Sequence, residues 1–178
     1  MVSQTAYTAL IAMVALERLA ELVVSRRNAA WSFRQGGVEH GRGHWPFMVL
    51  LHTAFLVACP LEVWALDRTF LAALGWPMLL VVVGAQALRW WCITTLGHQW
   101  NTRVIVVPGL PRISGGPYRF VSHPNYVAVV LEGFALPLVH TAWITALAFT
   151  VLNAALLAVR IRCENEALAS LEAPSGQA

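Results

Sequence analysis

Long apolar runs, rather than short alternating stretches, dominate the chain. They cover four blocks: residues 6–24, 45–66, 70–96 and 126–160. A helix needs about 20 apolar residues to cross the roughly 30 Å hydrocarbon core of a bilayer, and the first three blocks approach that length. A break near Pro137 and His140 divides the last block into 126–138 and 141–160. The pattern therefore predicts five membrane segments, the last two forming a helical hairpin.

Composition supports a membrane location and bounds the number of domains. Of the 178 residues, 58% are hydrophobic and only 12% are charged, far from the average of soluble domains. The length is that of one domain. We therefore expect a single all-α integral membrane domain over residues 1–178.

Basic residues predict the orientation of this domain. They gather in the connections after the first and third segments and behind the last: Arg26, Arg27, Arg34, Arg42, Arg103, Arg112, Arg119, Arg160 and Arg162. Short cytoplasmic loops carry an excess of Lys and Arg, so these regions are expected on the cytoplasmic face of the cell (inner) membrane, with the N-terminus outside. The chain starts without the basic region and cleavage site of a signal peptide, so the first segment is expected to be retained. The net charge of +3 then faces anionic lipid, and nucleic acid is not an expected partner.

The cysteines and histidines form no recognisable ligand motif. Cys59, Cys92 and Cys163 are far apart, and the sequence has neither a CxxC pair nor two histidines at ligand spacing. Neither a disulfide framework nor a metal site is expected. The sequence also lacks a Gly-rich P-loop and the internal repeat of many transporters.

Several ionisable residues fall inside the apolar segments, where exposure to lipid costs at least a few kcal/mol. Glu17, Arg18 and Glu21 lie at helical spacings, and ion pairing with Arg89 across the bundle is favoured over contact with a substrate. His52 stands alone in the second segment. A hydrogen-bonded core histidine and a catalytic histidine remain equal alternatives for it.

Residues 97–125 differ in kind from the apolar segments. Around them, "LGHQWNTRVIVVPGLPRISGGPYRFVSHPNY" combines glycines, prolines, aromatic rings and hydrogen-bonding side chains. This composition is too polar for a span and too rich in turn-forming residues for a flexible linker, which predicts a loop that holds a polar ligand at the membrane face. Pro124 predicts the start of a helix, with Ser122 as its cap and the first-turn amides open to a ligand.

Two motifs resemble the signature of the isoprenylcysteine carboxyl methyltransferase family of integral membrane enzymes. They are "GGPYRFVSHPNY", with Gly116, Tyr118, His123, Pro124 and Tyr126, and "RIRCENEAL", with Arg160 and Glu164. The stretches "ERLAELVVSRRNAAW", "HWPFMVLLH" and "LGHQWNTRVIVVPGLP" are similar to a bacterial subgroup that O-methylates alkylpyrones or alkylresorcinols beside type III polyketide synthases. The chain departs from the family pattern at Ser122, where a basic residue is usual, and at Asn165, which replaces the second acid of a Glu-Glu pair.

The resemblance implies S-adenosylmethionine as the cofactor, bound by the loop 97–125 and the C-terminal segment 160–172. The implied binding residues are Arg112, Ile113, Gly116, Tyr118, His123, Pro124, Tyr126 and Glu164. Arg160 is implied to hold the oxygen of the methyl acceptor, the alternative being the ordinary basic flank of a final span. A carboxylate or the enol of a 4-hydroxy-2-pyrone is already ionised near neutral pH. A resorcinol hydroxyl needs a base, for which His98 and His52 are the candidates.

The implied function is O-methylation of a lipophilic acceptor at the bilayer, an alkylpyrone or alkylresorcinol, with a type III polyketide synthase as a partner. A prenylcysteine carboxylate is the alternative acceptor within the family. A membrane reductase of sterol type and a small transporter are the alternatives outside it. The acceptor is expected to reach the cofactor laterally between segments, with "GAQALRWWCITTLG" either lining a gate or only packing helices at an interfacial belt.

Overall fold

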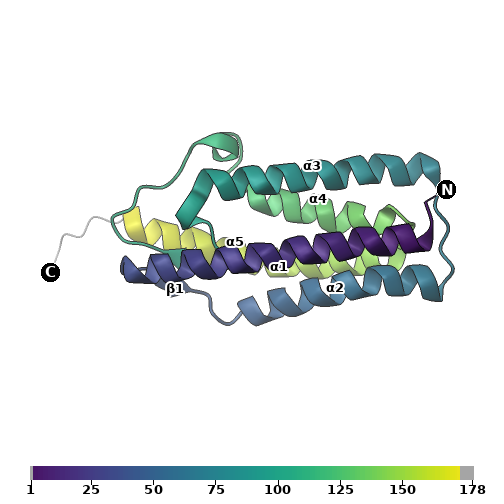
Figure 1. The fold of residues 1–178 in the computed structure, drawn as a ribbon. Coiled ribbons are helices and arrows are strands. Elements are labelled where there is room, and N and C mark those ends of the chain that lie inside the picture. Colours follow the sequence, from purple (N-terminus) through teal and green to yellow (C-terminus); the bar gives the residue numbers. More distant parts are fainter. Residues whose placement is uncertain (1, 173–178) are drawn as a thin grey trace.

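Five helices run side by side along one long axis in the computed structural model, which describes residues 2–172 (Figure 1). They are α1 (Gln4–Arg34), α2 (Trp45–Ala65), α3 (Ala72–Leu96), α4 (Pro124–Leu138) and α5 (Trp143–Glu172). The chain is mostly helical, which agrees with the all-α membrane protein that the apolar runs predict.

Three of these helices are long and apolar enough to cross a membrane: Trp45–Ala65, Ala72–Gln99 and Trp143–Ala169. Their outer surfaces expose large apolar side chains, such as Leu80 at 73% and Leu147 at 69%, as a lipid-facing surface does. Helix α4 is apolar but has only 15 residues, and α1 contains Glu17, Arg18 and Glu21. The chain is therefore an integral membrane protein, and the finer count of five spans stays a prediction.

The helix boundaries follow local sequence signals, with one exception. Ser3 caps α1, because its hydroxyl oxygen accepts the Ala6 N–H at 3.1 Å. Helix α4 begins at Pro124, as predicted, but the prediction that Ser122 caps it is wrong: the N-cap residue is His123, and no side chain makes a capping hydrogen bond. A proline at the first helical position needs no partner for its missing N–H, which lessens the need for a cap.

Helices α1 and α5 extend beyond the apolar runs at residues 6–24 and 141–160. Helix α1 continues to Arg34. Within this extension, the Asn28 side-chain amide donates to the carbonyl oxygens of Gly97 at 3.0 Å and Trp100 at 2.8 Å. Helix α5 continues to Glu172. These polar extensions enclose the loop region at one end of the bundle.

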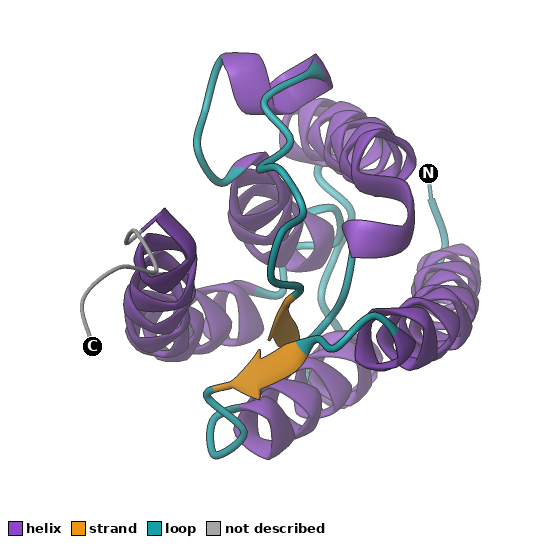
Figure 2. Ribbon diagram, turned by 90° about the vertical axis from the view of Figure 1, so that its left-hand side faces the viewer, coloured by secondary structure: helices purple, strands orange, loops and turns teal. Residues whose placement is uncertain are grey.

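A two-stranded antiparallel sheet joins the two long connections at this end (Figure 2). Strand β1 (Val38–His40) pairs with β2 (Val104–Val106), and Val38 lies opposite Val106. The connection from α3 to α4 also contains the 3₁₀ turns η1 (Gly97–Gln99) and η2 (Gly116–Arg119). Both arginine-rich connections therefore lie at the same end, as the predicted orientation requires.

The apolar core fills the bundle between the helices. All five helices contribute buried side chains, among them Tyr7, Val63, Val82, Leu136 and Phe149. The Tyr7 hydroxyl donates to the Leu136 carbonyl oxygen at 3.2 Å, which satisfies the polar end of a fully buried ring. This packing holds the helix ends that frame the loop region.

Candidate functional site

A cavity of about 150 Å³ lies at the end of the bundle that carries the strands. It is lined by residues from the connection 96–113, from 118–126 at the start of α4, and from Arg160, Glu164 and Leu168 of α5. We call it the loop-end cavity. It brings together the two sequence motifs, which are far apart in the chain.

Tyr126, Arg160 and Glu164 form a hydrogen-bonded group in this cavity, the loop-end cluster. Arg160 Nε donates to the Tyr126 hydroxyl at 2.8 Å, and that hydroxyl donates to the Glu164 carboxylate. Helical spacing of i and i+4 places Arg160 and Glu164 on one face of α5. Arg160 is 7% exposed, and among the residues that the structure describes its two Nη nitrogens have no hydrogen-bond partner. This residue of the cavity lining therefore keeps two unpaired guanidinium nitrogens.

His123 forms the edge of this cluster. Its ring stacks on that of Tyr126 with 5.3 Å between centroids, and its Nδ1 lies 3.8 Å from a Glu164 oxygen. Its Nε2 lies 3.0 Å from the Asn165 side-chain oxygen. The asparagine that departs from the family pattern therefore orients the motif histidine.

The loop residues predicted to bind a cofactor divide into two groups. Tyr118, Arg112 and Ile113 line the loop-end cavity, and burial raises the pKa of the Tyr118 phenol. The phenol therefore stays neutral and keeps a proton that it can donate. Gly116 and Pro124 lie outside the lining and set the backbone, Gly116 by close contact with α3 and Pro124 as the first residue of α4.

His98 and His52, the predicted catalytic bases, do not line the loop-end cavity. His98 is exposed and stacks on Trp31 with 5.2 Å between ring centroids. His52 lies within α2, and its Nδ1 is 2.8 Å from the Met48 carbonyl oxygen. The structure therefore brings neither histidine to Arg160.

A different histidine lies near Arg160. Burial and the positive charge of Arg160 lower the pKa of His44, which precedes α2. His44 is therefore neutral near pH 7. It does not line the loop-end cavity.

Two further polar residues of the cavity were not predicted from the sequence. Trp100 is 3% exposed, and among the described residues its indole N–H has no partner; the Asn125 side-chain oxygen is likewise buried and without one. Buried polar groups are nearly always paired, so these two lining residues have unused hydrogen-bonding capacity beside the cavity. Trp100 lies in "LGHQWNTR" and Asn125 in "HPNY", so position within a motif was the signal that could have found them.

The walls of the cavity offer complementary chemistry to a zwitterionic ligand with an apolar part. Glu164 supplies a carboxylate whose side chain is 30% exposed, and Trp100 and Arg112 supply donors. Val106 and Leu168 supply apolar surface. A carboxylate, donors and apolar faces are what an aminoacyl group joined to an aromatic base requires.

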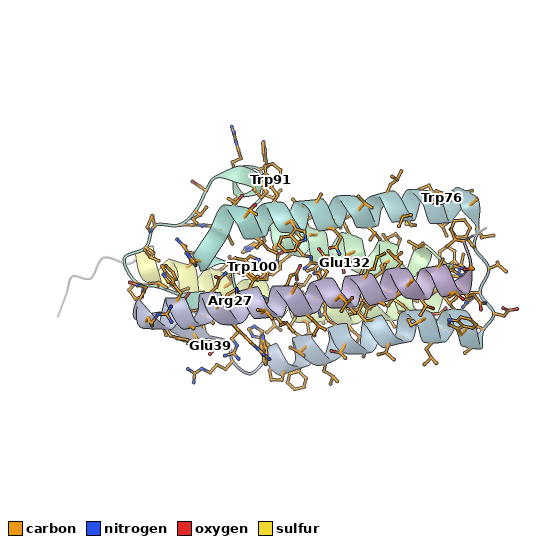
Figure 3. The ribbon with its side chains drawn as sticks, in the orientation of Figure 1. Arg27, Glu39, Trp76, Trp91, Trp100 and Glu132 are labelled. Atoms are coloured by element: carbon orange, nitrogen blue, oxygen red, sulfur yellow. The ribbon has the colours of Figure 1, made fainter. Side chains whose placement is uncertain are left out.

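A second cluster of charges lies in the middle of the bundle. This mid-bundle cluster consists of Glu17, Arg18, Glu21, Gln86, Arg89 and Glu132. Arg89 is 2.5 Å from Glu132 and 3.7 Å from Glu21, and Arg18 is 3.0 Å from Glu21. The predicted ion pairing across the bundle is confirmed. Figure 3 places Trp100 closer than Glu132 to the end that carries the strands.

Comparison with known proteins gives the family. The model of the isoprenylcysteine carboxyl methyltransferase (ICMT) family matches residues 78–170, which contain most of the cavity lining. An uncharacterized protein of Bacillus subtilis, YpbQ, is 37% identical over 160 residues, which cover 89% of this chain and 94% of that protein. An uncharacterized protein of Haemophilus influenzae is 26% identical over 157 residues, with 86% and 90% covered. No solved structure matches. With its apolar helices and this match, the chain belongs to the isoprenylcysteine carboxyl methyltransferase family of membrane methyltransferases.

Proposed function

We propose that this protein transfers the methyl group of S-adenosylmethionine to an acidic oxygen of a lipophilic acceptor, most readily the enol of an alkylpyrone. The observation that supports this choice is the burial and incomplete hydrogen bonding of the Arg160 guanidinium. Its guanidinium is buried at the cavity, only its Nε is used, and both Nη nitrogens remain available to an anion. A buried cation with free donors binds an oxyanion better than a neutral hydroxyl.

The residues of the loop-end cavity fit S-adenosylmethionine, the cofactor of this family. Glu164 would hold the ammonium group or the ribose hydroxyls, and Trp100 Nε1 and Arg112 would donate to polar acceptor atoms. Asn125, His123, Tyr118 and the Ile113 region would complete the walls. The orphaned indole N–H of Trp100 supports this fit, because a ligand acceptor would satisfy it.

When bound, S-adenosylmethionine supplies an electrophilic methyl group on a positively charged sulfur. The task of the protein is then to position the acceptor oxygen, because correct orientation alone removes much of the barrier. Arg160 would hold that oxygen as an anion, and Tyr126 would hold Arg160 through its hydroxyl. Tyr126 is in turn fixed by Glu164.

The positions of the histidines favour an acceptor that is already ionised. A resorcinol hydroxyl would need a general base within hydrogen-bond reach. His52 and His98 both lie outside the cavity, and the ring nitrogens of His123, which lines it, already face Glu164 and Asn165. An alkylpyrone enol is therefore a better substrate than an alkylresorcinol in this proposal.

A prenylcysteine carboxylate is the second candidate. The two free Nη nitrogens of Arg160 suit a bidentate carboxylate as well as they suit an enolate. Membership of the family supports this acceptor equally.

The membrane explains how such acceptors are presented. A long alkyl or prenyl tail would stay in the bilayer while the polar head reaches the loop-end cavity. In this proposal the protein resides in the inner membrane with the cavity facing the cytoplasm, beside a type III polyketide synthase that supplies the acceptor. The exposed apolar surfaces of α2, α3 and α5 support the lipid contact.

A panel of acceptors tests the proposal. Purified protein in lipid nanodiscs is given radiolabelled S-adenosylmethionine and either an alkyl-4-hydroxy-2-pyrone, an alkylresorcinol or an S-prenylcysteine. The proposal expects the highest kcat/KM with the pyrone. Transfer to prenylcysteine alone would move the assignment to the second candidate, and absence of transfer to all three would contradict both.

A further inference from the structure

A short exposed segment beside α3 has an apolar tip that the cofactor cavity does not use. Residues 116–121, which we call the interfacial segment, comprise η2 and the two residues after it. Phe120 is 71% exposed and Val121 is 47% exposed. The Arg119 guanidinium lies 5.2 Å from the centre of the Phe120 ring. Transfer of Phe and Val side chains out of water is favourable, so contact of this tip with an apolar neighbour would stabilise it.

The segment is held tightly against α3. Gly116 has a φ of +54°, and a side-chain carbon there would lie 2.5 Å from the Thr95 hydroxyl oxygen and 3.2 Å from the Trp91 indole nitrogen. Only glycine allows this approach of the segment's backbone to the α3 side chains. Figure 1 shows the segment projecting outward from the end of α3, and Figure 3 shows Trp91 where the two meet.

Exposed tryptophans place this contact at the level of a membrane interface. Trp76 near one end of α3 and Trp90 and Trp91 near the other are all at least 40% exposed. At about 1.5 Å per residue, Trp76 and Trp91 are about 22 Å apart along the axis. Tryptophan concentrates at both boundaries of the hydrocarbon core. The Trp91 end, and the interfacial segment packed on it, therefore lie near one boundary.

The lipid-facing surface of α4 continues toward the segment. Exposed apolar side chains follow one another at helical spacing from the first turn of α4: Val127, Val130, Leu131 and Phe134. The apolar tip precedes this stripe in the chain. This continuity with lipid-facing surface indicates that the neighbour of the tip is the bilayer.

The same segment also carries one wall of the loop-end cavity. Tyr118 lines that cavity, whereas Arg119 and Phe120, the next two residues, are exposed. The 3₁₀ turn holds the exposed tip and Tyr118 together. The Phe120 N–H donates to the Pro117 carbonyl oxygen at 3.2 Å, and Tyr118 lies between these two residues. Movement of the tip would therefore move the wall.

We infer that the interfacial segment is a membrane anchor. Phe120 and Val121 insert among the lipid headgroups and upper acyl chains, and Arg119 lies beside lipid phosphates. This contact holds the Tyr118 wall of the cavity in place. The anchor adds a lipid-binding role to the segment that is independent of which acceptor is methylated.

Lipid quenching tests the insertion directly. A fluorescent probe is attached at Val121→Cys in a Cys163→Ser background, since Cys59 and Cys92 are buried and Cys163 is partly exposed. A matched probe is attached at Pro108→Cys, an exposed position in the same connection just after β2. In nanodiscs containing shallow spin-labelled lipid, the anchor predicts quenching at 121 several-fold above that at 108. Equal quenching at the two positions would overturn it.

Hydrogen exchange tests the link to the cavity wall. Phe120→Ser is compared with Phe47→Ser, which removes a similarly exposed ring (62%, against 71% for Phe120) from the first turn of α2. If the segment is an anchor, amides of residues 115–122 should exchange about ten-fold faster in Phe120→Ser than in wild type. Their exchange should be unchanged in Phe47→Ser. Unchanged exchange in both would remove the proposed link. Neither readout requires methyl transfer, so failure of the proposed function would not imitate failure of the anchor.

Discussion

The mid-bundle cluster and the loop-end cluster both combine arginine with glutamate, yet their surroundings differ. In the first, Arg89 faces Glu132 at 2.5 Å, and the adjoining cavity measures about 10 Å³, room for a single water. In the second, Arg160 and Glu164 are both joined to one tyrosine hydroxyl and border a cavity of about 150 Å³. The first cluster pairs opposite charges, although Arg18 Nε, Arg89 Nε and Glu21 Oε1 make no hydrogen bond within the described part of the chain. The second cluster borders a larger cavity.

This difference separates stabilising charge from charge available to a ligand. Buried ion pairs offset their own desolvation, and removal of one partner leaves the other uncompensated. The free Nη nitrogens of Arg160 and the partly exposed Glu164 carboxylate have no such closed pairing. Substitutions in the mid-bundle cluster should therefore act on stability, and substitutions in the loop-end cluster on binding and rate.

The largest effect is expected for Glu132→Leu. It leaves Arg89 and Arg18 without their shared carboxylate, which should lower the free energy of unfolding by about 3–5 kcal/mol. Detergent-induced unfolding measures this loss. Glu17→Gln is the control, because the Glu17 side chain is 22% exposed and its loss should cost less. Equal stability of Glu132→Leu and wild type would contradict the structural role of the cluster.

Arg160→Ala should reduce the rate while leaving the fold intact. Loss of the donors that hold the acceptor anion should lower kcat by about 10²–10³-fold, as for removal of an oxyanion-binding donor. Arg162→Ala, which removes an exposed arginine two residues along α5, should retain activity. Turnover with saturating cofactor checks both variants. A rate for Arg160→Ala within two-fold of wild type would show that the residue is only a basic flank.

Trp100→Phe should have a moderate effect on cofactor affinity. It removes the orphaned indole N–H and keeps an aromatic ring, and one hydrogen bond of about 1 kcal/mol corresponds to roughly five-fold weaker binding. Trp31→Phe is the control, because Trp31 does not line the cavity. Unchanged affinity in Trp100→Phe would mean that water, rather than the cofactor, satisfies this N–H.

The smallest effect is expected for His98→Ala. Its ring is exposed and stacks on Trp31, so activity on an alkylpyrone and any activity on an alkylresorcinol should both stay within about two-fold of wild type. Loss of a general base would instead lower kcat by at least about 100-fold. Such a loss with the alkylresorcinol, the acceptor that needs a base, would restore His98 as a catalytic residue.

The sequence could predict much of this arrangement because the relevant signals are local. Apolar runs of membrane length predict the helices, and the spacing of Arg160 and Glu164 predicts a shared helix face. The strands could not be predicted in this way, because three residues are too few to show an alternating pattern. Their pairing joins connections that are far apart in the chain.

Prediction of the site residues from the sequence was limited for the same reason, because their contacts join distant parts of the chain. The sequence does not show which histidines reach the site. His123 contacts the loop-end cluster, whereas His98 stacks on Trp31 outside it. Trp100 and Asn125 become informative only when burial leaves their polar atoms without partners. Burial depends on tertiary packing, which no single motif contains.

Calorimetric titration of S-adenosylmethionine into nanodisc-embedded protein tests the central claim most directly. Wild type is compared with Glu164→Gln and with Glu166→Gln, an exposed glutamate two residues along the same helix. Because a hydrogen bond to a charged group contributes about 1.5–3 kcal/mol, Glu164→Gln should bind roughly 10- to 100-fold more weakly and Glu166→Gln as tightly as wild type. Equal affinity in all three proteins, or no binding by folded wild type, would contradict the assignment of the loop-end cavity to the cofactor.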